Sequence, residues 1–548
     1  MDQAILTANR WCLLTVVGAM IYLLFRWCTH HGSQSVRKVR FGHVPAWEAH
    51  IGQKAVSSTV PTVGRPGILG PWIDAVTWAW DARDRIQKGY NQVLAQSLLD
   101  TSALKMIDYH QYSDYAFRVS TPNGWETCIC NLEMIKEYKN LMDNQMSALA
   151  VTSETFQARY TLPGGDWDNI HQLPPQSAVA RALMWLKGRA ANEKDPYSSE
   201  MMEVFECAFQ REIIIPARDH LAIACFPQYC RVVAAITVKA LLGSMAADSG
   251  AIDQFVKYAE AVPRDGFLIA IFPKILRPLV ARLCTAPKLS DQLINLLLEE
   301  IGRRRAMNIH GEPQDMTDWM VQWVEKNPKN SMRGAAARII ATFFGGIHTT
   351  TQLIVHSLFE IATRPEYVRP LREEIEDALA AHGGWNKTSL ESMVKLDSFV
   401  KECQRYNPLD AASLSRQATC DFQFSNGLHL RKGTYLFAPN GPMVGDSHLY
   451  PSAHEFDGMR FWKLGRKAQR LQDYRLVASS ATYLQFGDGR HICPGRFMAA
   501  DEVRLLLAYT LWRYDVAIEG HRPRPKNTTF KRFCFPDMSA KIELKTRL

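Results

Sequence analysis

A single cysteine, Cys493, lies among residues that could hold its sulfur as a thiolate. The stretch QFGDGRHICPG, residues 485–495, surrounds it with three glycines, a proline, an arginine and a histidine. An apolar run from Phe497 to Leu511 follows, and it predicts a buried helix that begins at or just after the cysteine. The dipole and free N–H groups of a helix N-terminus favour an anion, and Pro494 suits the first turn. A thiolate in this position can act as a nucleophile or as a metal ligand.

Several kinds of chemistry compete for this thiolate. A zinc site has little support, because no second Cys/His pair accompanies His491 and Cys493 at a suitable spacing. A nucleophilic cysteine needs a general base, and the sequence does not single one out. The segment GDGRHI is not a dinucleotide fingerprint, since Ile492 stands where the last glycine is required. An inert core cysteine does not explain the surrounding glycines and cations, whereas a shielded anionic sulfur suits a haem iron.

The ten residues FGDGRHICPG, Phe486 to Gly495, resemble the haem-binding signature of the cytochrome P-450 monooxygenases. By this resemblance Cys493 is the axial thiolate of a haem b iron. Phe486, Gly487 and Gly495 belong to the same cofactor-binding motif. His491 falls at the basic position, where the family usually holds a haem propionate.

Two further motifs fit the resemblance. KECQRYNP contains Glu402 and Arg405, which match the family's E-x-x-R helix, and residues three apart share a helix face. HEFDGMRFW, residues 454–462, resembles the segment whose arginine, here Arg460, joins that pair. The implied network is charge-assisted and structural, holding the cysteine loop in place. Arg416, in LSRQA, falls at the family's second propionate contact, and two haem carboxylates would be costly to bury without cations.

The oxygen site is expected on a long helix between Arg333 and Ala362. Thirty residues correspond to about 45 Å of helix, and a proline boundary at Arg364-Pro365 ends it. Gly345-Gly346 lies in the middle, where each glycine costs about 1 kcal/mol relative to alanine. Threonines follow, and their hydroxyls can bond back to helix carbonyls. A weakened helix lined with hydroxyls is useful where dioxygen and water must lie against the backbone.

GGIHTT, residues 345–350, is similar to the family's proton-delivery motif. The resemblance implies that Thr349 hydrogen-bonds the bound oxygen. The residue before it is usually an acid in the family, and here it is His348, as in some filamentous-fungal members. Imidazole can relay protons near neutral pH, so His348 is a candidate catalytic residue. A satisfied core histidine is the alternative, and Thr350 or Thr351 could share the proton route.

The pattern of elements predicts an α+β, mainly α-helical fold with small β-sheets. Residues 115–130 and the segment DFQFSNGLHL each read as a hairpin, with turns at Asn123-Gly124 and Asn426-Gly427. Amphipathic helical patterns fill the chain between them, so strands and helices are segregated. No linker or repeat divides residues 71–548, which we expect to form one catalytic domain. Six candidates for the substrate pocket are Phe343, Phe344, Leu409, Ala412, Leu414 and Phe533.

The N-terminus predicts a membrane anchor within residues 1–30, joined to the body by a Pro/Gly-rich connection at 31–70. Trp11–Phe25 is uncharged and would form about 22 Å of helix, with Arg10 and Arg26 able to reach the headgroups. The excess of cations after this segment places the body in the cytosol. A cleaved signal peptide is the rival interpretation, but CTHHGSQS offers no clear A-x-A site. We therefore expect a single-pass protein of the endoplasmic reticulum.

Composition agrees with an intracellular, membrane-associated enzyme. The net charge of +9 is spread over 548 residues without a basic arm, which argues against nucleic-acid binding. The 12 cysteines include no C-x-x-C pair and fit buried thiols in a reducing compartment.

The resemblance implies an oxygenase that inserts one oxygen atom into a lipophilic molecule and releases the other as water. RDRIQKGYNQ and LYPSAHEFDGMRFWK resemble fungal secondary-metabolism members of the ent-kaurene-oxidase type, which favours a terpenoid. Without a flavin module in the chain, electrons should come from NADPH through a separate reductase, or from cytochrome b5. The alternatives left open are a haem-thiolate isomerase or dehydratase that needs no reductase, and a non-catalytic haem-binding protein.

Overall fold

The computed structural model describes residues 60–65, 70–99, 116–161, 175–191, 197–213, 221–243, 249–306, 313–327 and 330–547. All of these belong to the unit that runs from Ala46 to Leu548. The predicted anchor at 1–30 and most of the connection at 31–70 lie outside the described residues. In the part that is described, one helix, Cys225–Leu242, is long and apolar enough to cross a membrane, but 78% of it is buried, as in a core helix.

Helices make up most of the described chain. The first group runs up to the central helix: α3 (Gly70–Leu99), α4 (Leu132–Tyr138), α5 (Ala148–Phe156), α6 (Ala158–Thr161), α7 (Pro175–Ala191), α8 (Tyr197–Glu212), α9 (Cys225–Leu242), α10 (Ser249–Ala270), α11 (Arg277–Leu283), α12 (Ala286–Ala306) and α13 (Met316–Lys326). The second group begins with the central helix: α14 (Met332–Thr363), α15 (Val368–His382), α16 (Lys387–Ser392), α17 (Val394–Tyr406), α18 (Asn440–Val444), α19 (Arg460–Ala468) and α20 (Arg496–Arg513). Four short 3-10 helices are η4 (Pro365–Tyr367), η5 (Leu471–Tyr474), η6 (Gly489–His491) and η7 (Glu519–His521).

The strands of the described residues form four small sheets. The largest has the order β1-β2-β3-β9-β6-β4, from β1 (Thr62–Val63), β2 (Ala116–Thr121), β3 (Gly124–Ile129), β9 (Tyr435–Ala438), β6 (Ser413–Ala418) and β4 (Met146–Ser147). A second sheet has the order β10-β13-β5, from β10 (Tyr514–Ile518), β13 (Lys541–Thr546) and β5 (Leu221–Ala224). Two hairpins remain, β7 (Phe422–Gln423) with β8 (His429–Leu430) and β11 (Thr528–Phe530) with β12 (Phe533–Phe535).

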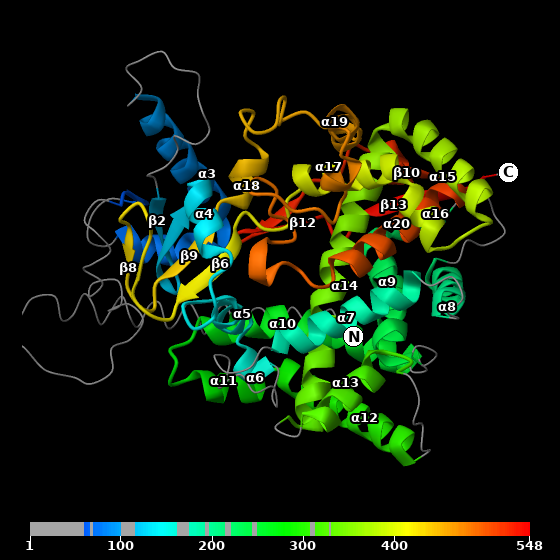
Figure 1. Cartoon of the computed structure of the whole chain (residues 1–548), viewed down its shortest axis with the longest axis horizontal. Coiled ribbons are helices and arrows are strands. Elements are labelled where there is room, and N and C mark those ends of the chain that lie inside the picture. The colour runs from blue at the N-terminus through cyan, green and yellow to red at the C-terminus, as the bar shows by residue number, and fades with distance from the viewer. Residues whose placement is uncertain are drawn as a thin grey trace, which may run out of the picture. The chain divides into compact units, whose positions relative to one another are not determined.

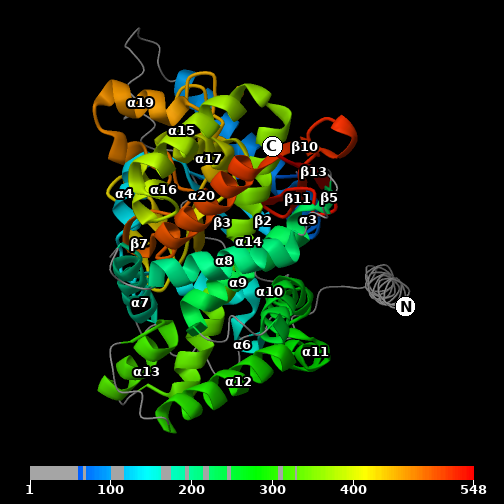
Figure 2. The same cartoon turned by 90° about the vertical axis from the view of Figure 1, so that its right-hand side faces the viewer.

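Helix α14 is the element on which the site is built. Its N-cap is Ser331, whose hydroxyl accepts a hydrogen bond from the Gly334 amide at 3.0 Å. It ends before Pro365, as the sequence predicts. Helices α9 and α20 pack along it, with α12 and α13 near its start and α17 near its end (Figures 1 and 2). The larger hydrophobic core gathers around this helix.

The mainly helical fold with small sheets is confirmed, as are both predicted hairpins. β2 pairs antiparallel with β3, and Gly124 has a φ of 107° that suits glycine. β7 pairs with β8 around Gly427, which has a φ of 90°. The segregation of strands was only partly right, because β3 pairs in parallel with β9 (Glu126 opposite Tyr435). The early and late strands therefore form one sheet, at the left of Figure 1, rather than two separate groups.

Candidate active site

The cysteine loop turns back on itself just before α20. The Cys493 amide donates to the Phe486 carbonyl at 2.8 Å, which closes the loop. Gly487 and Gly489 have φ values of 70° and 68°, which favour glycine. A Cβ on Gly489 would also lie 2.7 Å from the Lys139 carbonyl oxygen, so no larger residue fits without movement. These constraints hold the sulfur-bearing residue at the start of α20, where the sequence places it.

Burial and the neighbouring groups have opposite effects on the pKa of the Cys493 thiol. Burial raises its pKa, while the backbone amides of Gly495 and Arg496 and the charge of Arg496 lower it. Arg496 also donates to the Cys493 carbonyl at 2.9 Å, which fixes its position beside the sulfur. Burial favours the protonated thiol, which is a poor nucleophile. A bound metal ion would displace its proton. The setting therefore suits a metal ligand better than a free nucleophile.

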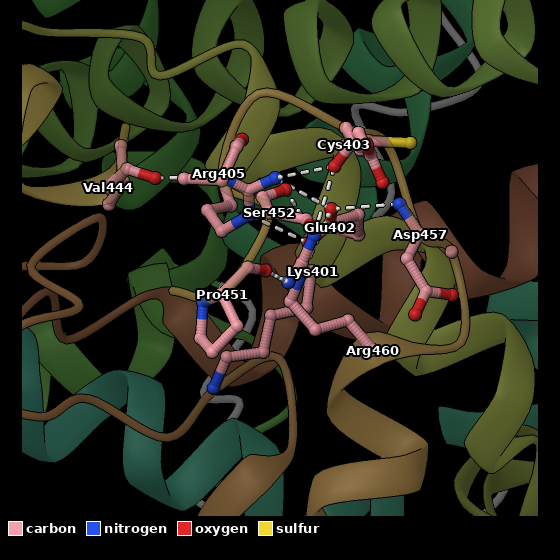
Figure 3. Close-up of polar contacts among 12 residues, drawn as sticks. Lys401, Glu402, Cys403, Arg405, Val444, Pro451, Ser452, Asp457 and Arg460 are labelled. Carbon is pink, nitrogen blue, oxygen red and sulfur yellow. Dashed lines mark hydrogen bonds and ion pairs between the residues drawn. The ribbon is translucent and has the colours of Figure 1, made fainter. Parts of the chain in front are cut away.

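The structure brings Glu402, Arg405 and Arg460 together in a buried network (Figure 3). Arg405 donates to the two carboxylate oxygens of Glu402 at 2.8 and 2.7 Å, in the bidentate arrangement. Arg460 Nε lies 3.1 Å from both oxygens of the same carboxylate. The backbone amide of Asp457 adds a further donor at 3.1 Å.

The remaining donors of both arginines are used by backbone carbonyls of residues 444–455. Arg405 Nη1 donates to Val444 at 2.7 Å and to Ala453 at 2.8 Å. Arg460 Nη1 donates to Pro451 at 2.6 Å. All three ionised side chains thus have hydrogen-bond partners, as buried charges require.

Helix α17 is also tied to the segment that leads into the cysteine loop. The Lys401 ammonium donates to the carbonyls of Arg475 and Ala478 at 2.8 and 3.1 Å. Tyr483 Oη donates to Gln404 Oε1 at 2.7 Å. The network and the loop are therefore mechanically connected, although the network does not touch Cys493 directly.

The predicted propionate contacts lie in one neighbourhood with a surplus of hydrogen-bond donors. His491 Nε2 is 3.3 Å from Asp143 Oδ2. Arg416, 3% exposed, donates from Nη1 to the Ser415 carbonyl at 2.9 Å. Its Nε and Nη2 are buried and have no hydrogen-bond partner among the described residues, and the same holds for the Tyr138 hydroxyl. Burial acts to raise the pKa of Asp143, but His491, the Ala148 amide and the charge of Arg416 together lower it.

Buried hydrogen-bond donors without a partner in such a cluster favour the binding of an anionic acceptor. Burial lowers the pKa of Arg416, yet its guanidinium remains a cation at any physiological pH. Asp143 lies beside His491, whereas Arg416 Nε and Nη2 have no partner among the described residues, which leaves donors for the carboxylates of a haem. With a sulfur ligand at Cys493 as well, the residues present fit this group.

On α14, Thr349 faces the space in front of Cys493. Its hydroxyl donates to the Gly345 carbonyl at 2.8 Å, so its oxygen lone pairs remain available on the cavity side. His348 points elsewhere: its ring stacks on Phe226 of α9, with centroids 6.1 Å apart. Burial lowers the pKa of His348, against a hydrogen bond with the Ala259 backbone that raises it.

A cavity of about 550 Å³ lies between Thr349 of α14 and Cys493 of the loop. This volume is within the usual range for a ligand pocket. It is bounded by α5, α7, α9, α14 and α20, and by the cysteine loop. Predicted site residues that line it are Cys493, Phe486, Gly495, Thr349 and Leu409. Lining residues that sequence reasoning missed include Leu149, Thr152, Val179, Leu183, Thr237, Leu241, Arg338, Gln352, His356 and Glu502.

Five of the six predicted pocket residues do not line this cavity. Phe343 is fully buried against Phe255, and Phe344 packs on Phe156. Ala412 and Leu414 belong to the core beneath the large sheet. Phe533 forms a bridge with Asp410 at the edge of β12. The α14 residues that line the cavity include four with small side chains: Ala337, Ala341, Gly345 and Gly346.

Comparison with known proteins agrees with this geometry. The family model for cytochrome P-450 matches residues 223–544. The cytochrome P-450 monooxygenase penQ of Penicillium crustosum is 56% identical over 541 residues, 99% of this chain and 98% of the relative. The monooxygenase ptmQ of Penicillium ochrochloron is 57% identical over 540 residues (98% and 97%), and paxQ of Penicillium paxilli is 47% identical over 509 residues (92% and 95%). The chain therefore belongs to the cytochrome P-450 family and is a monooxygenase.

Proposed function

We propose that this monooxygenase oxidises a lipophilic terpenoid, of the indole-diterpene class, in fungal secondary metabolism. The observation that carries the proposal is the cavity that joins Cys493 to Thr349 and is lined largely by apolar side chains. Similarity to fungal monooxygenases over almost the whole chain supports the same class of chemistry. A rigid, weakly polar polycycle suits such a cavity, since apolar contact supplies affinity and a few polar groups set orientation.

Each residue would have a distinct task. Cys493 would supply the sulfur ligand of the haem iron, supported by Arg496 and the first amides of α20, and Phe486 would shield it. Arg416 and His491 would hold the haem carboxylates. When bound, the haem supplies dioxygen activation with two electrons and two protons. Thr349 offers a hydroxyl on the cavity side of α14, where it can hold water or pass on a proton.

The network of Glu402, Arg405 and Arg460 would hold the backbone beneath the cysteine loop. Its charges are fully used within the network and by backbone carbonyls, so it has no free group for chemistry at the cavity. Its proposed role is therefore structural.

Association with the endoplasmic reticulum membrane has support from the described surface. Ile275, Leu279 and Leu283, in and just before α11, are 87%, 60% and 82% exposed. Arg277 in the same helix turns inward and donates to Glu154 at 2.8 Å, which fixes the helix with its apolar side chains outward. Such residues can enter the headgroup region of a bilayer. With the body at the cytosolic surface, a membrane-bound NADPH-dependent reductase, or cytochrome b5, would supply electrons. If charges guide this contact, the rate of electron transfer should depend on salt concentration, and a rate insensitive to salt would count against it.

The test is turnover with a defined electron donor. Membranes containing the protein and a purified NADPH-dependent reductase would be incubated with a panel of indole diterpenes under isotopically labelled dioxygen. We expect one labelled oxygen atom in a product whose formation requires both NADPH and Cys493. Product without label, or product that forms without NADPH, would refute monooxygenation of this substrate class. Turnover confined to fatty acids or steroids would refute the terpenoid assignment alone.

A further inference from the structure

The cavity wall carries two buried polar side chains on α14, one and two turns beyond Thr349. Gln352 and His356 both line the cavity, and they are 5% and 3% exposed. Positions 349, 352 and 356 share one face of a helix, so these side chains continue the stripe that Thr349 begins. Gln352 Oε1 and His356 Nε2 are buried and have no hydrogen-bond partner among the described residues. Buried polar atoms are normally paired, so both indicate a polar group that the cavity receives.

The hydrogen bonds of His356 determine which of its ring nitrogens carries the proton. Arg524 Nη2 lies 3.1 Å from His356 Nδ1. A guanidinium group only donates, so Nδ1 is the acceptor and the proton of the neutral ring is on Nε2. Burial, and then the charge of Arg524, lower the pKa of His356 to about 3, so the ring stays neutral. His356 therefore offers an N–H donor to the cavity, whereas Gln352 Oε1, one turn away, is an acceptor.

The rest of the network behind His356 is complete. Arg524 Nε donates to Glu360 Oε1 at 2.7 Å, and the Glu360 side chain is fully buried. Asn407 Nδ2 donates to the same carboxylate oxygen at 3.1 Å. Asn407 Oδ1 accepts from Arg524 and Asn527 at 3.1 and 2.8 Å. Among the described residues, none of these four side chains has a buried polar atom without a partner. The network thus fixes the ring of His356 and leaves one donor, Nε2, for the cavity.

A haem would not use this donor and acceptor. The two carboxylates are the hydrogen-bonding groups at the edge of haem b, and Arg416 and His491 are proposed to hold them. The rest of that edge is hydrocarbon, which can neither accept from His356 nor donate to Gln352. Water or a polar group of the substrate therefore fills this role. A hydroxyl group fits, because it accepts one hydrogen bond and donates another.

We propose that Gln352 and His356 bind a hydroxyl group of the substrate and so select a hydroxylated terpenoid. The inference deepens the proposed function and rests on it. The hydroxyl oxygen accepts from His356 Nε2 and donates its hydrogen to Gln352 Oε1. At 1.5 Å per residue, this contact lies about 5–10 Å along α14 from Thr349, so the hydroxyl marks a part of the polycycle away from the oxidised carbon. A ketone or an ether can use only the donor of His356 and should bind more weakly than an alcohol.

The test compares the affinity of each alcohol with that of its deoxy counterpart. Matched pairs of indole diterpenes, steroids and long-chain hydrocarbons would be titrated into the ferric holoenzyme, and the shift of its Soret band would give each Kd. We expect an indole-diterpene alcohol to bind the wild type roughly ten- to a hundredfold more tightly than its deoxy counterpart. Equal affinities within every pair would overturn the proposal.

Two variants and a control locate the contact. Gln352→Met keeps the length of the side chain and removes the acceptor, and His356→Leu removes the donor. Each should weaken binding of the alcohol towards that of the deoxy compound, whose own Kd should stay nearly the same. Thr342→Val is the matched control on the same face of α14: its hydroxyl donates to the Arg338 carbonyl at 2.8 Å, so the preference for the alcohol should be kept. An unchanged preference in both Gln352→Met and His356→Leu would overturn the proposal.

The remaining outcomes separate this inference from its alternatives. Gln352→Met breaks none of the hydrogen bonds of the network, so it decides the matter if His356→Leu takes up no haem. Equal loss of affinity for the alcohol and its deoxy counterpart in Gln352→Met would mean that the two side chains bind water only, and the proposal would fall. A preference for alcohols confined to the steroid or hydrocarbon pairs would keep the hydroxyl site and refute the indole-diterpene assignment. A wild-type protein without a haem-thiolate spectrum would instead refute the proposed function.

Discussion

Replacing Glu402 by glutamine should destabilise the haem-binding form more than any other single change in the network. The substitution keeps the shape of the side chain and removes only its charge. Arg405 and Arg460 then remain as two buried guanidinium groups without a carboxylate. By contrast, Arg460→Leu leaves a neutral Glu402–Arg405 pair, so its effect should be smaller.

The magnitude follows from the contacts that the carboxylate makes. Glu402 accepts from Arg405 at 2.8 and 2.7 Å, from Arg460 at 3.1 Å and from the Asp457 amide at 3.1 Å. A glutamine must place an NH₂ group at one oxygen position, where it faces a guanidinium donor instead of accepting from it. Breaking a buried ion pair in this way costs about 3–5 kcal/mol. The equilibrium constant for local unfolding around this network should therefore rise roughly one hundredfold to several thousandfold.

The assay is the rate at which the carbon monoxide-bound haem-thiolate spectrum disappears on gentle heating. Glu455→Gln is the matched control: its backbone carbonyl accepts from Arg405 and Arg460, but its side chain is exposed. We expect the control to behave like the wild type and Glu402→Gln to lose the spectrum at a far lower temperature, or never to gain it. A Glu402→Gln protein that loses the spectrum within about twofold of the wild-type rate would refute the structural role.

Three further outcomes are expected. Thr349→Ala should keep the carbon monoxide spectrum but divert NADPH electrons to hydrogen peroxide, because the variant lacks the hydroxyl that would hold water or pass on a proton in the cavity. An unchanged peroxide yield would contradict this. Arg416→Leu should speed haem transfer to apomyoglobin roughly tenfold or more, since a charged hydrogen bond is worth about 1.5–3 kcal/mol; equal transfer rates would count against the propionate contact. Burial raises the pKa of Glu502 from 4.5 to about 8. Its contribution to stability is therefore full below about pH 4.5 and is lost as pH rises through 8. Glu502→Gln should then melt above the wild type by a margin that grows from pH 5 to 8.5, and a constant margin would refute the shift.

Local patterns in the sequence predicted the parts of the site that depend on short-range order. The glycines and proline around Cys493 determine the loop, and the apolar run after it gives α20. The end of the long helix α14 could be predicted because Pro365 marks it, and its N-cap, Ser331, lies two residues before the predicted start. Helical spacing allowed the Glu402–Arg405 contact, and the resemblance to the family's motif made it the expected one.

The rest depended on how distant elements pack. The parallel pairing of β3 with β9 joins residues about three hundred positions apart and leaves no local signal. The cavity face of α14 was assigned to Phe343 and Phe344 because pockets favour aromatic side chains, whereas Gly345 and Ala341 leave the space that a ligand needs. The position of His348 depends on α9, since its ring stacks on Phe226 of that helix. Glu502 had a signal that was overlooked: an acid within an apolar helical run.

The central claim is that the Cys493 sulfur is an iron ligand. It is tested most directly by a carbon monoxide difference spectrum of the dithionite-reduced, membrane-bound protein, beside a Cys493→Ala variant. We predict the red-shifted Soret band of a haem-thiolate complex in the wild type and its loss in the variant. The same band in Cys493→Ala, or no such band in folded, haem-supplied wild-type protein, would contradict the account.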